Sequence, residues 1–119
     1  MTFGSFNNLS KMTDAVVSLW ARILSCVEQS RLFLKTKQFN DERTVQDTIE
    51  RFRKFGIHPD RLIIEGTTPS HTAHLETYNR VDIALDTFPY NGITTSAEAL
   101  WMGVPVITKK GDRLSLIHI

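Results

Sequence analysis

The sequence contains one cysteine, almost no net charge and no long apolar run. Cys26 can form no disulfide within the chain and has no cysteine cluster for a metal, so we expect a reducing, cytoplasmic compartment. With 14 basic and 13 acidic residues, the net charge of +1 predicts no bulk attraction to nucleic acid or to an acidic membrane. No run approaches the ~18 apolar residues of a membrane span, and the start lacks the pattern of a signal peptide.

Several common site motifs are also missing. The sequence has no G-x-G-x-x-G, no G-x-x-x-x-G-K-[ST] and no G-x-S-x-G, which excludes an ordinary dinucleotide, P-loop or hydrolase site. The histidines make no metal pattern with Cys26 or the carboxylates, so we expect no zinc site. There is no internal repeat, and 119 residues are about one domain.

Short β-like runs alternate with longer helical ones. This order predicts an α/β fold, a doubly wound parallel sheet of about five strands with crossover helices. The predicted strands are 2–6, 31–36, 62–65, 81–86 and 105–108. Four helices are expected between them: one capped by Thr13, one capped by Asn40 with Phe55 on its core face, one over 70–79 capped by Ser70, and one over 94–102.

The stretch "TFPYNGITTSAE" places two threonines at a helix start, just after the fourth predicted strand. In parallel sheets ligands lie outside the carboxyl ends of the strands, where free helix N–H groups favour an anion. Thr94 and Thr95 beside those groups suit a phosphate or diphosphate. Residues 95–98 also fit a capping box, which stabilises a helix without any ligand. Both interpretations stay open at this point.

Two residues after the first strand suit the same ligand. Lys11 can neutralise a phosphate as a point charge, although a solvated surface lysine is the plainer interpretation. Asn8 offers a donor and an acceptor, although Asn7-Asn8 also reads as an ordinary turn. Asp86 ends a buried strand and suits a structural role. From the residues alone, we predict that the chain is an α/β unit that forms half of a nucleotide- or anion-binding site.

Longer motifs carry a resemblance over about residues 2–113. The segments "TFGSFNNLSKMT", "FGIHPDRLIIEG" and above all "DTFPYNGITT" resemble the C-terminal catalytic region of the O-linked N-acetylglucosamine transferase and SPINDLY-like family. The resemblance implies a Rossmann-like second lobe of a GT-B glycosyltransferase. It implies inverting transfer from UDP-GlcNAc to protein Ser or Thr, with no cofactor and no metal.

The resemblance also assigns roles to seven residues of the UDP-sugar site. Lys11 matches the catalytic lysine that neutralises the departing diphosphate, as an inverting transferase without metal requires. The others match positions that contact the diphosphate, the base or the ribose. They are Asn8, Thr94 and Thr95 at the diphosphate, His74 on the uracil, Thr68 near the base, and Glu98 on the ribose.

Some positions depart from the family pattern. Asn8 and Glu98 stand where animal members have Gln and Asp, and both changes keep the polarity. Ile93 replaces a histidine. Some relatives use GDP-fucose or UDP-glucose, so the identity of the donor sugar stays open. The alternative outside the transferases is a non-catalytic nucleotide-binding α/β module whose threonines are only helix caps.

The resemblance divides the chain into a partial nucleotide-sugar-binding lobe, 1–113, and a tail outside the family pattern, 114–119. Family members also have a first catalytic lobe and tetratricopeptide repeats upstream. Their acceptor-binding histidines lie in that first lobe, so we expect this chain alone to transfer no sugar to acceptor proteins.

Overall fold

A six-stranded sheet forms the centre of the molecule, with strand order β3-β2-β1-β4-β5-β6. The computed structural model describes residues 1–67, 70–87, 93–110 and 113–117. The strands are β1 (Thr2–Ser5), β2 (Arg31–Lys35), β3 (Leu62–Glu65), β4 (Ile83–Leu85), β5 (Val106–Lys110) and β6 (Arg113–Ile117). The first five run parallel, which confirms the predicted doubly wound sheet.

The sixth strand was not predicted. β6 pairs antiparallel with β5, with Val106 opposite Ile117 and Lys110 opposite Arg113. Most of β6 therefore comes from 114–119, the segment expected to lie outside the family pattern. An antiparallel edge strand on a parallel sheet is a common arrangement, and the boundary at residue 113 stays a prediction.

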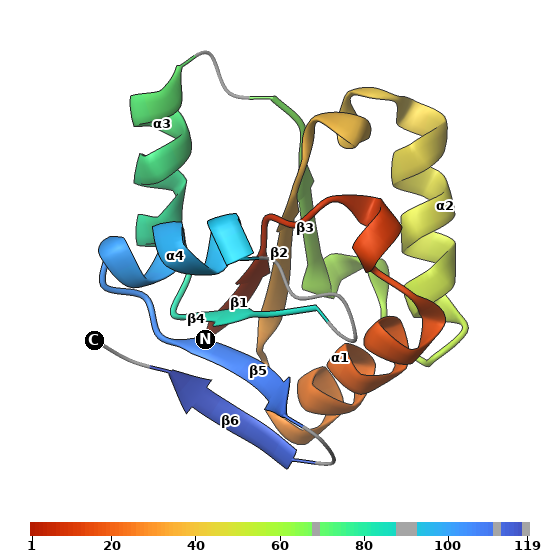
Figure 1. The fold of residues 1–119 in the computed structure, drawn as a ribbon. Coiled ribbons are helices and arrows are strands. Elements are labelled where there is room, and N and C mark those ends of the chain that lie inside the picture. Colours follow the sequence, from red (N-terminus) through yellow and green to blue (C-terminus); the bar gives the residue numbers. More distant parts are fainter. Residues whose placement is uncertain (68–69, 88–92, 111–112, 118–119) are drawn as a thin grey trace.

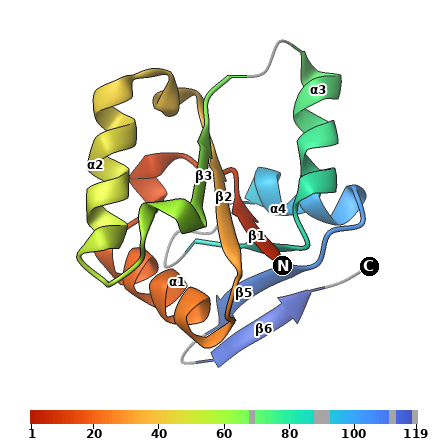
Figure 2. The ribbon, with the colours of Figure 1, turned by 180° about the vertical axis from the view of Figure 1, so that it is seen from behind.

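Helices cover both faces of the sheet (Figures 1 and 2). Helices α1 (Asp14–Cys26) and α2 (Glu42–Arg53) lie on one face. Helices α3 (His71–Glu76) and α4 (Ile93–Trp101) lie on the other. None of the helices in the described part of the chain is long and apolar enough to cross a bilayer.

Strand β2 is apolar at successive positions because both of its faces are covered by helices. Leu32 and Leu34 belong to the core under α1 and α2, together with Trp20 and Phe52. Phe33 belongs to the core under α3 and α4. Because successive side chains of a strand point to opposite faces, a strand covered on both sides needs an unbroken apolar run.

Two predicted helix caps are confirmed and one is wrong. Thr13 Oγ1 accepts from the Val16 amide and Ser70 Oγ from the Ala73 amide. Asn40 instead ends the 3-10 helix η2 (Lys37–Asn40), and Asp41 occupies the N-cap position of α2. The Asn40 side chain accepts from the Thr67 amide at 2.9 Å, so it joins η2 to the end of β3.

The core face predicted for α2 is wrong at its last position. Phe52 is fully buried, but Phe55 is 44% exposed. The helix ends at Arg53, and Gly56 has φ +84°, a conformation that suits glycine at a helix end. Since the chain has left the helical path by then, Ile57 rather than Phe55 returns to the core.

Candidate functional site

The sheet has its topological switch point between β1 and β4. β1 pairs with β2 on one side and with β4 on the other. The chain then leaves β1 towards α1 and leaves β4 towards α4, on opposite faces of the sheet. In open α/β sheets a ligand crevice lies outside the carboxyl ends of such a strand pair.

Asp86, at the end of β4, has the structural role expected for it. Its Oδ1 accepts from the Thr87 amide at 2.9 Å, and its Oδ2 accepts from Thr108 Oγ1 at 3.0 Å. Asp86 and Thr87 are both buried. The bond to Thr108 joins the carboxyl end of β4 to β5.

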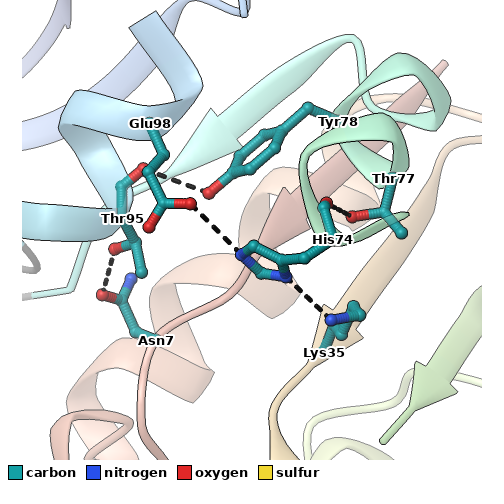
Figure 3. Close-up of polar contacts among 7 residues, drawn as sticks. All are labelled: Asn7, Lys35, His74, Thr77, Tyr78, Thr95 and Glu98. Carbon is teal, nitrogen blue, oxygen red and sulfur yellow. Dashed lines mark hydrogen bonds and ion pairs between the residues drawn. The ribbon is translucent and has the colours of Figure 1, made fainter. Parts of the chain in front are cut away.

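A hydrogen bond joins the loop after β1 to the start of α4. Thr95 Oγ1 donates to Asn7 Oδ1 at 2.6 Å (Figure 3). α4 begins at Ile93, so Thr95 is the third helical residue and not the residue before the helix. A capping box needs its threonine at the N-cap. The capping-box interpretation of residues 95–98 is therefore wrong.

Glu98 lies one turn further along α4 and faces His74 of α3. Glu98 Oε2 is 3.3 Å from His74 Nε2, and each side chain is about a quarter exposed, at 23% and 24%. Glu98 Oε2 is buried, and it has no hydrogen-bond partner in the described part of the chain. The two side chains are therefore in close polar contact without a hydrogen bond.

Lys35 contacts the ring nitrogen of His74 that does not face Glu98. Its Nζ lies 2.8 Å from His74 Nδ1, a contact drawn as a dashed line in Figure 3. Lys35 is the last residue of β2 and is only 5% exposed. The sequence analysis did not select it, although a charge that ends an apolar strand at the ligand edge was a usable signal.

Tyr78 was also missed, and it forms the inner wall of the site. Its ring packs edge-on against Phe6, with centroids 4.4 Å apart, and its hydroxyl donates to the Thr95 carbonyl at 3.3 Å. Burial, and then the nearby Glu98 carboxylate, raise the pKa of Tyr78 above its ordinary value. The phenol therefore remains a neutral donor at physiological pH.

The remaining predicted residues fall into two groups. Asn8 and Lys11 lie at the 3-10 helix η1 (Leu9–Lys11), directly after Asn7 and at the same edge of the sheet. Asn8 Oδ1 accepts from the Ser10 amide, so its turn interpretation holds in the structure. Thr94 lies in α4, but its side chain is outside the described atoms, and Thr68 is outside the described residues.

An open cavity of about 610 Å³ lies at the opposite edge, where β2 and β3 begin. Arg61, one of two arginines that line it, donates to the carbonyls of Leu24, Val27 and Ser30 and so caps the end of α1. We favour the switch point over this cavity because the charge of Arg61 is already used structurally. The topology also places ligands at the other end of the strands.

The fold and the site define the class of protein: a doubly wound α/β lobe with polar side chains converging at its switch point. The model of glycosyl transferase family 41 matches residues 1–116. The chain belongs to this family of glycosyltransferases.

Named relatives agree with this assignment. A Solanum lycopersicum protein named probable UDP-N-acetylglucosamine–peptide N-acetylglucosaminyltransferase SPINDLY is 44% identical over 94% of this chain and 12% of its own length. The Caenorhabditis elegans UDP-N-acetylglucosamine–peptide N-acetylglucosaminyltransferase is 29% identical over 97% of this chain and 10% of its own length. The chain thus spans about a tenth of these relatives.

A solved structure supports the fold independently. A variant of the Thermobaculum terrenum O-GlcNAc transferase superposes with a TM-score of 0.85 at 42% identity, covering 90% of this chain and 20% of that one. This likeness confirms the predicted fold class, an α/β lobe of a GT-B glycosyltransferase.

Proposed function

We propose that this chain is the donor-binding part of a protein O-glycosyltransferase. In this proposal it binds the UDP moiety of UDP-GlcNAc, and the complete enzyme transfers the sugar with inversion to Ser or Thr of acceptor proteins. Family membership supports the reaction class. The names of the relatives supply the donor and the peptide acceptor.

The observation that carries the proposal is the meeting of three elements at the switch point. The loop after β1 is bonded to α4 through Asn7 and Thr95, and α3 reaches α4 through His74 and Glu98. The amino end of α4 offers N–H groups to a diphosphate. Glu98 Oε2 is buried although the side chain as a whole is 23% exposed, and we propose that the other carboxylate oxygen accepts from a ribose hydroxyl.

Lys11 is the proposed electrostatic catalyst. The departing diphosphate develops negative charge in the transition state, and a fixed cation stabilises that charge. Lys11 ends η1, four residues after Asn7, which is bonded to Thr95 of α4. We propose that Lys11 and the amino end of α4 act on the same diphosphate as two sources of positive potential. We propose that this arrangement replaces a metal ion and that the reaction needs no cofactor.

The first experiment is a calorimetric titration of the purified chain with UDP, GDP and inorganic phosphate. It is repeated with Lys11→Ala and with the double variant Thr94→Ala/Thr95→Ala. Lys54→Ala is the matched control, because Lys54 is an exposed lysine just beyond α2. Since a hydrogen bond to a charged group contributes ~1.5–3 kcal/mol, Lys11→Ala should weaken UDP binding at least about tenfold.

The outcomes of the titration distinguish the proposed donor, a different donor, and no donor binding by this chain. UDP binding above GDP, weakened at Lys11 and the threonines but not at Lys54, supports the proposed donor. A preference for GDP points to a fucosyl donor. Binding of UDP no tighter than that of phosphate, by a chain with native circular dichroism, overturns donor binding by this part of the enzyme.

A further inference from the structure

Lys35 is a buried cation to which neither the resemblance nor the proposed function gives a role. Strand alternation places it on the same face as Phe33, beneath α3 and α4. Burial lowers the pKa of Lys35 below its ordinary 10.5, while Glu65 and Glu98 act in the opposite direction. A buried ammonium group is costly unless it is well paired, so its contacts indicate its use.

The contact with His74 determines the state of the imidazole. A lysine ammonium has only donors, so Nδ1 of His74, 2.8 Å away, must be the acceptor. A neutral imidazole then carries its hydrogen on Nε2. That nitrogen lies 3.3 Å from Glu98 Oε2, so the edge of the ring that carries the hydrogen adjoins the carboxylate, although the two atoms form no hydrogen bond.

The surroundings of His74 keep this ring from turning. Phe6 and Tyr78 pack edge-on against it, with centroids 5.8 and 5.9 Å away. His74, held by these rings, connects β2 to α4: Lys35 lies at one nitrogen and Glu98 at the other. The three side chains thus form one polar chain across the inner edge of the crevice (Figure 3).

We propose that Lys35 is a positioning residue for the donor nucleotide: by holding His74 as the Nε2–H tautomer, it orients the Glu98 carboxylate that receives the ribose. This inference rests on the proposed function, because it assigns Glu98 to the donor. Lys35 itself lies beneath His74 and does not touch the ligand. Its effect on binding passes through the two residues above it.

The first test reads the tautomer directly and needs no ligand. Nitrogen NMR of the histidine side chains distinguishes Nδ1–H from Nε2–H, and His74→Gln assigns the signal among the four histidines. We expect Nε2–H in the wild type and a mixture in Lys35→Met, which keeps the length of the side chain but has no donor. Lys37→Met removes an exposed lysine nearby and should leave the signal unchanged.

The second test measures donor affinity with the same variants. Loss of the oriented carboxylate should weaken UDP binding about tenfold in Lys35→Met, with no change in Lys37→Met. Lys35→Arg retains donors and should recover part of the affinity and the Nε2–H signal. Inorganic phosphate does not carry a ribose, so its binding should be the same in all variants.

The outcomes separate this inference from the proposed function. An unchanged tautomer in Lys35→Met, or a changed tautomer with wild-type UDP affinity, overturns the role of Lys35. If the wild type itself binds no UDP, the proposed function fails and the donor role of Lys35 falls with it. The NMR result then still shows whether Lys35 sets the tautomer of His74.

Discussion

At the scale of single residues, Tyr78 offers a test of burial through pH. The folded protein holds the Tyr78 proton more tightly than the unfolded chain, because its pKa is raised above the ordinary 10.0. The stabilisation linked to this proton is complete below pH 10 and is lost as the pH rises above that value. Tyr78→Phe has no such proton, so its stability should fall less in alkali.

Urea unfolding of both proteins checks this sign. At about pH 7, Tyr78→Phe should be about 1 kcal/mol less stable than the wild type, since it loses one long hydrogen bond to Thr95. The difference should shrink at about pH 11, where unfolding of the wild type releases a proton. A difference that stays constant or grows contradicts the buried, neutral phenol.

The sequence suggested individual candidate residues but not the contacts between them. His74 and Glu98 were selected by resemblance, and the structure brings them within 3.3 Å. Lys35 is 39 positions from His74 along the chain, so no local pattern could reveal that contact. Thr95 was left open between a cap and an anion-binding residue, and its hydrogen bond to Asn7, 88 residues away, was hidden from local patterns for the same reason.

At the scale of elements, the end of α1 depends on an arginine from outside the helix. Arg61, in the 3-10 helix η3 (Pro59–Arg61), donates to the carbonyls of Leu24, Val27 and Ser30 and to Ser30 Oγ. The last carbonyls of a helix have no partner within it, and a cation there also complements the helix dipole. Arg61 therefore fixes the junction between α1 and β2.

We expect Arg61→Met to lower the free energy of unfolding by about 2 kcal/mol, because buried carbonyls lose charged donors. Arg53→Met is the matched control: its partner Glu50 is 3.5 Å away and both side chains are more than half exposed. Such surface pairs contribute roughly 0–1 kcal/mol. Equal effects of the two substitutions in urea unfolding would show that Arg61 is not a cap.

Elements with a local signal were predicted, and those with a distant cause were not. The strand 62–65 is found with its predicted bounds, since an apolar run between turn residues is sufficient to mark it. Asn40 was taken for a cap because it precedes two acidic residues, but its bond partner is Thr67 in another loop. Phe55 continues the apolar spacing of α2 in the sequence, but the helix ends at Arg53, before this residue.

At the scale of the whole molecule, the alternation of strands and helices was enough to predict the parallel sheet, and with it the edge at which we propose the ligand site. A right-handed crossover leaves few ways to order five parallel strands, and the crevice follows from that order. The alternation of strands and helices did not predict β6. It is an antiparallel strand that directly follows another strand, with no helix between them to announce it.

The two halves of the sheet meet at Gly4, where close packing limits the side chain. Gly4 pairs with Phe33 on one side and with Ala84 on the other. A Cβ atom here would lie 2.6 Å from Cγ2 and 2.8 Å from Cγ1 of Val81, which is buried as the chain enters β4. The central strand therefore has room for a hydrogen atom only.

We expect Gly4→Ala to destabilise the protein by about 2 kcal/mol, within the range for overpacked cores. Val81→Ala removes the clashing methyl groups, so the double variant should be at least about 1 kcal/mol more stable than the sum of the single effects predicts. Val17→Ala, in the core on the other face, is the control and should add to Gly4→Ala without coupling. Urea unfolding of the five variants measures both cycles. Coupling to Val17 equal to that with Val81 would mean that Gly4→Ala disturbs the whole sheet rather than this one contact between its halves.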